Sequence, residues 1–588
     1  MRGMNQQFFE RSQTPGFACF PGRREAVIFS DPLELLEARA VDGVRPLLDA
    51  VDAATRRGLH AAGYVAYEAA PAFDPALAAH PRLEGLPLAC FFLYREPLRV
   101  PMAELSPPAG AGWAFGPWQP GCSREAYDEA LERVRTWIAA GDTYQINLTF
   151  PMGARFEGAP FAAFLDLHRG QRSGECAFLN CGGRSILSLS PELFFRLDGG
   201  LLETRPMKGT IARGRWPEED REQAQRLIES PKERAENVMI VDLLRNDMGR
   251  ISDTGSVAVS SLFDTERYRT LWQMTSTVRA RTGASLGEIF GALFPSGSVT
   301  GAPKVRAMQI IRELEPEPRG VYCGAVGRAG PGGKARFNVA IRTILLDAAA
   351  GEARYSVGSG VTWDSRAGSE HAECLLKAEV LRGPAEPFHL LETLLWDGRA
   401  FPMEREHLER MAASADYFDY PFDALAARKA LMDAAAPWAG NSAKVRLLLG
   451  EDGFFSAEGG PVPEAGEFLL ALADTPVQDT EVFLFHKTTR RAVYENARAA
   501  HPEAGDVLLW NTRGELTESC IANAAFLLGG RWLTPPVPCG LLPGVMRRRL
   551  LESGRISEGV VRVSDLPDVR GIALFNAVRG WMPARLMP

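Results

Sequence analysis

The chain has 588 residues, of which 46% are hydrophobic and 24% charged, and its formal net charge is −7. This composition is typical of a soluble globular protein, and the length suits about three or four domains of roughly 150 residues each. A mildly acidic chain without a basic stripe is not typical of a dedicated nucleic-acid binder, so we expect no nucleic-acid partner.

Cysteine usage and the apolar pattern predict a cytoplasmic protein. The nine cysteines include no C-x-x-C pair, which argues against a zinc knuckle or a disulfide framework and favours buried free thiols in a reducing compartment. The first 16 residues lack the apolar core of a signal peptide. No apolar run approaches the roughly 18 residues of a membrane-spanning helix, so we expect no membrane association.

Helical and strand-like patterns follow one another along the first part of the chain. Apolar residues recur at helical spacing from Tyr127 to Ile138, Ser123 can cap this helix, and Gly141 ends it. Gly199 and Gly200 predict a hairpin turn. Further helices are predicted over 217–230, 232–248 and 305–313, and strands over 185–189, 193–197, 201–204, 337–346 and 354–357.

A change of character at residues 382–387 predicts a domain boundary. Two prolines and a glycine in six residues cannot continue a helix and are typical of a linker. A strand-like segment over 388–396 and a helix from Leu408 to Phe418 follow it. We therefore predict an N-terminal part over 1–118, a catalytic domain over 119–381 and a separate module over 388–588.

Lys208 is the most informative residue of the first part. It lies between a strand-like segment and Gly209-Thr210, and no neighbouring acid makes it an ordinary surface ion pair. This placement suggests an amine held in a site. Glu192 lies between two predicted strands, where it is a second candidate, although a cap or turn role would also explain it.

Several acidic residues could hold a cation. Glu370 and Glu373 are three residues apart, so on a helix both carboxylates share one face. Glu236 begins an apolar helix. Mg²⁺ prefers carboxylate oxygens combined with substrate oxygens, but a solvated helix face is the more common explanation for such a pair taken alone.

The loop 295–304 is rich in small residues and leads into a predicted helix, whose first backbone N–H groups suit an anionic ligand. It lacks the G-K-[ST] of a phosphate-binding Walker loop, and no G-x-G-x-x-G stands between a strand and a helix. Nucleotide binding is therefore not favoured.

Taken in order, these segments resemble the chorismate-utilising enzymes, which include anthranilate synthase, isochorismate synthase and aminodeoxychorismate synthase component I. The resemblance covers about residues 10–380 and implies an α+β fold with large antiparallel sheets and a central substrate cleft. The matching segments are 141–149, 188–192, 206–210, 234–247, 295–304, 319–324 and 338–343.

The resemblance implies a role for each candidate. Aminodeoxychorismate synthases carry Lys in the P-x-K-G-T motif where anthranilate synthases carry Ala, so Lys208 indicates amination of chorismate at C4 through a covalent intermediate. Glu192 would be the general acid, and Glu236 and Glu373 would bind Mg²⁺, with Glu370 beside them. Substrate-binding positions would be Gly209, Thr210, Thr300, Gly301, Tyr322, Arg342, Gly358, Ser359 and Gly360.

The chain departs from the family pattern at two positions. Gln273 stands where many members have His, which puts any proton transfer there in doubt, and Met207 replaces the commoner Ile. No G-x-C-x-G glutaminase nucleophile is present. Ammonia would therefore come from solution or from a separate glutamine amidotransferase subunit.

The segments 485–491, 515–523, 533–536 and 540–547 follow one another in the last part of the chain. Together they resemble the fold-type IV pyridoxal-phosphate (PLP) enzymes over about residues 388–585, a family that includes branched-chain and D-amino-acid aminotransferases and aminodeoxychorismate lyase. Two small α/β subdomains with PLP between them, and a possible homodimer through this domain, are implied. Lys487 would form the Schiff base, Glu518 would pair with the pyridine nitrogen, and Arg410 would bind the phosphate. Asn523, Gly544 and Val545 are further cofactor-site candidates.

The two resemblances together predict a bifunctional enzyme of folate synthesis. The first half would convert chorismate to 4-amino-4-deoxychorismate, and the second would eliminate pyruvate from it to give 4-aminobenzoate. Two alternatives stay open: an anthranilate synthase component with an aminotransferase-like appendage, and a synthase whose C-terminal module is catalytically inactive.

Overall fold

The computed structural model describes residues 2–22, 24–107, 110–171, 174–382, 387–463 and 466–587. The described residues form two compact units. Unit 1 comprises Met1–Ala212 and Ala224–Ala385, and unit 2 comprises Arg213–Gln223 and Glu386–Pro588. Residues 383–386 of the predicted linker lie outside the described residues. Unit 2 thus includes a short segment from the middle of the first half of the chain.

Unit 1 contains a large antiparallel sheet that begins at a short strand within the small-residue loop 295–304. Its strand order is β17-β9-β21-β20-β11-β10-β1-β2-β6, with β7 and β8 paired to β9. The strands are β17 (Gly301–Ala302), β9 (Gln145–Gly158), β21 (Glu352–Val361), β20 (Thr343–Asp347), β11 (Arg184–Ser188), β10 (Ala177–Asn180), β1 (Ala18–Pro21), β2 (Glu25–Phe29), β6 (Leu98–Pro101), β7 (Trp113–Phe115) and β8 (Gln119–Pro120).

A second antiparallel sheet of unit 1 begins at the strand that carries Lys208. Its order is β14-β16-β13-β12-β19-β18-β4-β5-β3, with β15 paired to β16. The strands are β14 (Met207–Ala212), β16 (Leu271–Arg281), β13 (Leu201–Arg205), β12 (Leu193–Asp198), β19 (Lys334–Val339), β18 (Ala325–Gly330), β4 (His60–Val65), β5 (Ala89–Tyr94), β3 (Glu34–Ala38) and β15 (Ala258–Arg267).

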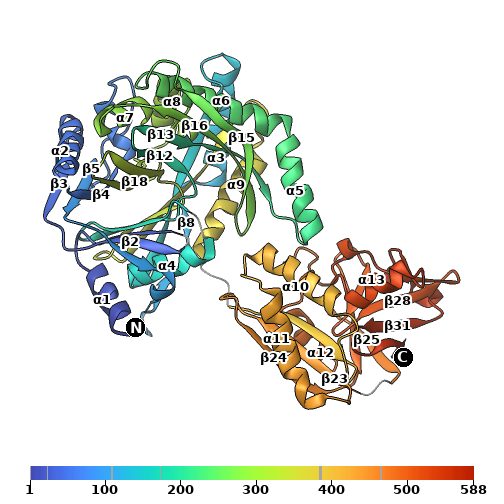
Figure 1. Ribbon diagram of the computed structural model, residues 1–588. Coiled ribbons are helices and arrows are strands. Elements are labelled where there is room, and N and C mark those ends of the chain that lie inside the picture. The colour runs from blue at the N-terminus through green and yellow to red at the C-terminus, as the bar shows by residue number, and fades with distance from the viewer. Residues whose placement is uncertain are drawn as a thin grey trace. The chain divides into compact units, whose positions relative to one another are not determined.

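The two sheets pack face to face, and helices cover their outer faces (Figure 1). Tyr64 from the second sheet and Ile186 from the first meet in the apolar layer between the sheets. Each large apolar side chain buried in such a layer contributes about 1.5–3 kcal/mol relative to an exposed one. The helices are α1 (Arg2–Ser12), α2 (Val44–Arg56), α3 (Arg124–Ala139), α4 (Pro160–Gln171), α6 (Pro231–Gly249), α7 (Leu286–Leu293), α8 (Lys304–Leu314) and α9 (Ala367–Ala378).

Local signals in the sequence explain where most of these elements start and stop. The Ser123 hydroxyl accepts a hydrogen bond from the backbone N–H of Ala126 and caps α3, as predicted. Gly199 and Gly200 both adopt positive φ in the hairpin between β12 and β13. The fold class predicted from the resemblance, α+β with large antiparallel sheets, is confirmed.

One predicted strand is wrong. Residues 337–346 do not form a single strand, because the chain leaves β19 after Val339 and enters β20 of the other sheet at Thr343. Arg342 sits at the break with φ of 49°, in the left-handed region that non-glycine residues rarely adopt. Apolar residues lie on both sides of the break, so the hydrophobic pattern alone did not reveal the change of sheet.

Unit 2 contains a small antiparallel sheet and a larger mixed one, as the predicted two-subdomain fold requires. The small sheet orders β22 (Leu390–Trp396), β23 (Ala443–Leu449) and β24 (Phe455–Pro461), and α10 (Glu404–Phe418) and α11 (Ala424–Ala435) pack on it. The larger sheet comprises β25 (Phe468–Leu472), β26 (Asp506–Trp510), β27 (Leu516–Ser519), β28 (Asn523–Leu528), β29 (Arg531–Thr534), β30 (Ser557–Glu558), β31 (Ile572–Asn576) and β32 (Gly580–Leu586).

Further helices complete unit 2. They are α12 (Ala492–Ala500), α13 (Val545–Glu552) and the first part of α5 (Pro217–Glu229), which is divided between the units. Within the described ranges, none of the helices combines the length and the apolar character needed to cross a membrane.

Candidate active sites

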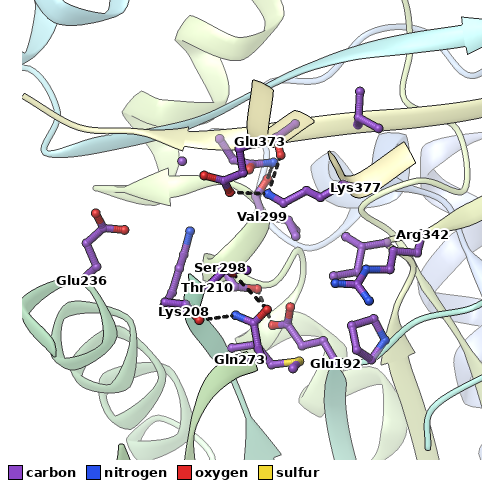
Figure 2. Close-up of a pocket in the computed structure, with 18 of the residues that line it drawn as sticks. Glu192, Lys208, Thr210, Glu236, Gln273, Ser298, Val299, Arg342, Glu373 and Lys377 are labelled. Atoms are coloured by element: carbon purple, nitrogen blue, oxygen red, sulfur yellow. Dashed lines mark hydrogen bonds and ion pairs between the residues drawn. The ribbon is translucent and has the colours of Figure 1, made fainter. Parts of the chain in front are cut away.

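A cavity of about 140 Å³ in unit 1 brings most of the predicted residues of the first half together (Figure 2). They come from β14, β21, α6, α9, the segments that follow β11 and β19, and the segment before β18. Segments far apart in the sequence thus meet at one site. The predicted residues on its wall are Glu192, Lys208, Gly209, Thr210, Glu236, Tyr322, Arg342, Gly358, Gly360, Glu370 and Glu373.

Lys208 extends from β14 toward the acidic side of the cavity, where Glu236 and Glu373 lie (Figure 2). Burial lowers the pKa of Lys208 below its usual value, and the nearby Lys377 ammonium adds to this effect. Glu236 and Glu192 oppose it. The lowered pKa increases the fraction of the amine that is neutral and can act as a nucleophile.

Glu192 lies beyond the end of β11 and is buried. Its Oε1 accepts a hydrogen bond of 2.5 Å from the Ser298 hydroxyl. Burial raises the pKa of Glu192 to about 7, against the opposing effects of this hydrogen bond and of Lys208. Glu192 can therefore be protonated near neutral pH, as a general acid must be.

Two helices each supply a pair of glutamates to the cavity. Glu233 and Glu236 lie three residues apart on α6, and Glu370 and Glu373 repeat this spacing on α9. Burial raises the pKa of Glu236; Lys208 opposes the rise, and Glu370 and Glu373 add to it. Several carboxylates that face one cavity repel one another, so a cation between them would relieve the repulsion.

Lys377 is the nearest cation to Glu373, and its Nζ lies 2.8 Å from the Glu373 carboxylate. It also donates a 2.8 Å hydrogen bond to the carbonyl of Gly358. Burial raises the pKa of Glu373, but the ion pair and hydrogen bond with Lys377 and the charges of Lys208 and Lys232 together outweigh it, so the net pKa is below the usual value. Glu373 is thus held ionised.

The backbone around Lys208 is fixed by neutral amide side chains. Gln273 on β16 donates a 2.8 Å hydrogen bond to the Gly209 carbonyl and accepts one of 3.1 Å from the Thr210 hydroxyl. Asn237 donates to the Lys208 carbonyl at 3.3 Å. Gln273, in place of the expected His, therefore holds the segment that carries Lys208 without offering a titratable group.

Three predicted substrate-binding residues do not reach the cavity wall. The Thr300 hydroxyl bonds to the Ser296 carbonyl, and Gly301 pairs with β9. The Ser359 side chain contacts the Tyr127 hydroxyl at 3.0 Å on the helix side of its sheet. Their neighbours Ser298, Val299, Gly358 and Gly360 form the wall instead. For β21 the reason is that alternate residues of a strand face opposite sides, so Gly358 and Gly360 face the cavity and Ser359 does not.

The sequence reasoning missed several residues of this site. Glu233 could have been predicted from the sequence, because it lies three residues before Glu236, just as Glu370 lies three residues before Glu373. Gln145 carried no such signal: its side chain is almost completely buried, and its amide nitrogen lies 3.4 Å from a Glu236 oxygen. The other missed wall residues include Asn147, Lys232, Ser298 and Lys377.

Lys487 of unit 2 occupies a second site. Burial lowers its pKa to about 8, and the charges of Arg410 and Arg491 add to the effect. Glu392 and Glu518 act in the opposite direction. The carbonyl of Lys487 accepts a 2.9 Å hydrogen bond from the N–H of Leu391, which ties its loop to β22.

Glu518 lies in β27 and is buried among hydrogen-bond donors. It accepts bonds of 2.9 Å from the Tyr494 hydroxyl, 2.9 Å from the Asn523 amide and 3.2 Å from the Leu542 N–H. Burial raises its pKa to about 7 despite these bonds. Asn523 also donates to the Leu542 carbonyl at 2.9 Å, so it supports both Glu518 and the loop before α13.

Arg410 on α10 makes a bidentate ion pair with Glu392, at 2.7 and 2.6 Å, and donates to the Pro543 carbonyl at 3.3 Å. Pro543 precedes Gly544, the N-cap of α13, and Val545 is the first residue of that helix. A Cβ at Gly544 would approach the Asn523 amide oxygen to 2.0 Å. Only glycine therefore fits there. Tyr494, Arg491 and Glu392 were not predicted from the sequence.

Comparisons with known proteins identify both halves. Residues 7–383 match the profile of the family described as chorismate binding enzyme. The chain belongs to the chorismate binding enzyme family. Residues 389–587 match the class IV amino-transferases. The predicted resemblances to the chorismate-utilising enzymes and to the fold-type IV enzymes are thereby confirmed.

Members of the chorismate binding enzyme family with different activities resemble this chain. Aminodeoxychorismate synthase component 1 of Salmonella typhimurium is 44% identical over 271 residues, which cover 46% of this chain and 59% of that protein. Anthranilate synthase component 1 1 of Haloarcula marismortui is 40% identical over 262 residues, 44% of this chain and 53% of that protein. The chain thus spans less than two thirds of the length of these relatives.

A solved structure of the family has the same fold. Anthranilate synthase component I of Streptococcus pneumoniae is 27% identical, with a TM-score of 0.55, and the match covers 60% of this chain and 91% of that one.

The residues of unit 1 fit a Mg²⁺ ion only in combination with a ligand. Within the described residues, no group of three or more His, Cys, Asp or Glu side chains is arranged as a ready metal site. The facing pairs Glu233–Glu236 and Glu370–Glu373 nevertheless supply the hard oxygen donors that Mg²⁺ prefers, and a substrate carboxylate could complete its coordination.

The residues of unit 2 fit PLP, which the class IV match implies. Lys487 is a partly buried amine of lowered pKa, and Glu518 is a buried carboxylate able to bind a protonated pyridine nitrogen. The N-terminus of α13, where Gly544 is the N-cap, offers backbone N–H groups to a phosphate. Arg410 is attached to the loop before this helix by its hydrogen bond to the Pro543 carbonyl.

Proposed function

We propose that this chain is a bifunctional 4-aminobenzoate synthase. Unit 1 would aminate chorismate at C4 to give 4-amino-4-deoxychorismate, and unit 2 would eliminate pyruvate from that product. The observation that carries the proposal is the position of Lys208, a partly buried amine of lowered pKa that shares one cavity with Glu192 and four further glutamates.

In the first step the neutral amine of Lys208 would add to C2 of chorismate. The ring electrons shift and the C4–O bond breaks, with Glu192 donating the proton that lets hydroxyl leave as water. Ammonia then adds at C4, the C2–N bond breaks, and Lys208 leaves as the free amine. The covalent route divides one difficult substitution into two displacements.

Other residues of the cavity would bind and orient the substrate. Glu236 and Glu373, with Glu233 and Glu370 beside them, would hold a Mg²⁺ ion, which neutralises a substrate carboxylate when bound. The Arg342 guanidinium lies on the opposite side of the cavity from Glu236 (Figure 2) and suits a second carboxylate. The ammonia would come from a separate glutamine amidotransferase subunit or from solution.

In unit 2, Lys487 would hold PLP covalently, Glu518 would bind its pyridine nitrogen, and Arg410 and the start of α13 would bind its phosphate. When bound, PLP supplies an electron sink. Lys487, whose pKa is about 8, is the base we assign to removal of the C4 proton of aminodeoxychorismate. Loss of pyruvate then leaves an aromatic ring.

The products formed from chorismate, Mg²⁺ and ammonium test the proposal. We expect 4-aminobenzoate and pyruvate from the purified full chain with added PLP, identified by mass spectrometry. Aminodeoxychorismate without 4-aminobenzoate would contradict the lyase assignment alone.

Anthranilate synthase is the second candidate, because an anthranilate synthase component is 40% identical to part of the chain. Anthranilate as the main product would establish it and refute the proposed amination at C4. The Lys208→Ala variant separates the two functions further. It should stop C4 amination, whereas an anthranilate synthase would not depend on this amine.

A further inference from the structure

The segment Arg213–Gln223 has no role in the proposed chemistry, yet its contacts place it in unit 2. It follows β14 directly and lies inside the range that matches the chorismate binding enzymes. Its described contacts converge on the residues that precede Lys487.

The beginning of this segment is fixed by an ion pair and by Tyr417 of α10. Arg213 is almost completely buried, and its Nε lies 2.7 Å from an Asp220 carboxylate oxygen. Its guanidinium stands 4.2 Å from the centre of the Tyr417 ring, a cation–π contact. The Tyr417 hydroxyl donates a 2.7 Å hydrogen bond to the Gly214 carbonyl.

Trp216 contacts the loop that contains Lys487. Its ring lies 5.0 Å from the ring of Phe485, which is two residues before Lys487. Arg215 covers the same Phe485 ring at 5.3 Å and donates a 3.0 Å hydrogen bond to the Asp479 carbonyl. Aromatic pairs of this kind contribute beyond the apolar area that they bury.

His486, directly before Lys487, is packed against the same structure. Its ring lies 4.4 Å from that of Tyr417, and its Nδ1 lies 2.9 Å from the Ser414 hydroxyl. The Tyr417 ring thus contacts both Arg213 and His486. Burial lowers the pKa of His486 to about 3; a hydrogen bond with the Arg215 backbone opposes this shift, and the Arg213 charge adds to it. His486 is therefore neutral near pH 7.

The other side of the Lys487 loop is held by β22 and the residue before it. Leu391 donates to the Lys487 carbonyl at 2.9 Å, and Thr489 donates its N–H to the His389 carbonyl at 2.9 Å. Without Arg213–Trp216, the loop would keep this backbone attachment. Phe485 would lose its contacts with Trp216 and Arg215, and the Tyr417 ring that contacts His486 would lose its contact with Arg213.

We infer that Arg213–Trp216 is a positioning element for Lys487, so that the PLP site is completed by a segment from the first half of the chain. It acts through Phe485 and His486 and touches none of the reacting atoms. Its role in cofactor binding rests on the proposed function of unit 2, but its effect on the loop does not.

Hydrogen exchange of the full chain tests the inference without cofactor. In Trp216→Ala, amides of residues 484–491 should exchange about tenfold faster, because the loop loses its aromatic partner. Trp216→Phe should restore most of the protection. Arg221→Ala is the matched control, since Arg221 is an exposed residue of the same segment that pairs with Glu218. Peptides from β21 provide an internal reference.

PLP titration gives the second readout. The dissociation constant for PLP should rise about tenfold in Trp216→Ala and stay at the parent value in Arg221→Ala. Unchanged exchange of 484–491 in Trp216→Ala would overturn the inference. If the parent chain bound no PLP while the exchange still rose, the positioning role would stand and the proposed PLP function of unit 2 would fail.

Discussion

At the scale of single residues, burial shifts the two main groups of the first site in useful and opposite directions. It lowers the pKa of Lys208, which favours the neutral amine, and raises that of Glu192, which favours the protonated acid. Solvent-exposed copies of the same residues would both be charged at pH 7. The cavity therefore prepares a nucleophile and a proton donor together.

Replacing Glu192 by Gln removes the proton donor and keeps the volume. We expect chorismate consumption to fall by about 10²–10⁴-fold. Because the pKa of Glu192 is about 7, kcat/KM of the parent should decline as the pH rises above that value and the acid ionises. This alkaline limb should be absent from Glu192→Gln in steady-state assays with ammonium.

Glu68→Gln is the control for this experiment. Glu68 is also buried with a pKa that burial raises to about 7, but it lies outside the cavity. The variant should therefore keep the alkaline limb. A limb that disappears in Glu68→Gln and persists in Glu192→Gln would refute the assignment of the general acid.

At the scale of elements, strands and helices decide which side chains can meet. The strand β14 presents Lys208 to the cavity, and the helices α6 and α9 each present glutamates at a spacing of three residues. Alternation along β21 directs Gly358 and Gly360 to the cavity and the Ser359 hydroxyl to Tyr127. Each contribution depends on the register of the element that carries it.

Gly209→Ala tests the irregular pairing of β14 with β16 next to Lys208. Gly209 has φ of 99°, and a Cβ there would lie 3.1 Å from both a Glu233 oxygen and the Met274 Cβ. We expect a loss of about 1–3 kcal/mol in the free energy of unfolding of unit 1, measured by denaturant titration. Gly153→Ala is the control, because its Cβ would meet no atom within 4 Å. Equal stability of both variants would contradict the argument.

Glu236→Gln tests the acidic helices. If α6 and α9 hold Mg²⁺ between them, the variant should need about tenfold more Mg²⁺ for half-maximal chorismate consumption, since one charged ligand becomes neutral. Glu229→Gln, at an exposed position at the end of α5, should leave the Mg²⁺ dependence unchanged. Activity that survives complete removal of Mg²⁺ by a chelator would rule out a metal role for these glutamates.

At the scale of the whole molecule, Lys208 lies in unit 1 and Lys487 in unit 2. The described wall of the first cavity comes from unit 1 residues alone, and the described contacts of the Lys487 loop come from unit 2, including Arg213–Trp216. Loss of one site should therefore leave the other intact.

Single-site variants should complement one another. Neither Lys208→Ala nor Lys487→Ala alone should form 4-aminobenzoate, but an equimolar mixture should, because Lys487→Ala supplies aminodeoxychorismate and Lys208→Ala converts it. The product is followed by its fluorescence after a lag in which the intermediate accumulates. A mixture that consumes chorismate and forms no 4-aminobenzoate would refute independent sites.

Motifs in the sequence were enough to predict both families, the fold class and eleven of the 24 described residues that line the first cavity. Lys208, Glu192 and Lys487 could be named in advance because the segments around them resemble motifs of two known families. The supporting residues Gln145, Lys377 and Tyr494 could not be predicted. Glutamine, lysine and tyrosine occur at many positions of the sequence, and nothing in their neighbourhood marks these three as residues of a site.

The sequence by itself determined the order of the elements, the candidate nucleophiles and the acidic pairs, because caps, turns and periodicity act between residues that are close along the chain. Only the tertiary structure decided that residues 337–346 divide between two sheets at Arg342, that Thr300, Gly301 and Ser359 lie behind the cavity wall, and that Arg213–Trp216 belongs to unit 2. These outcomes depend on burial and on contacts between distant segments, which local patterns do not encode.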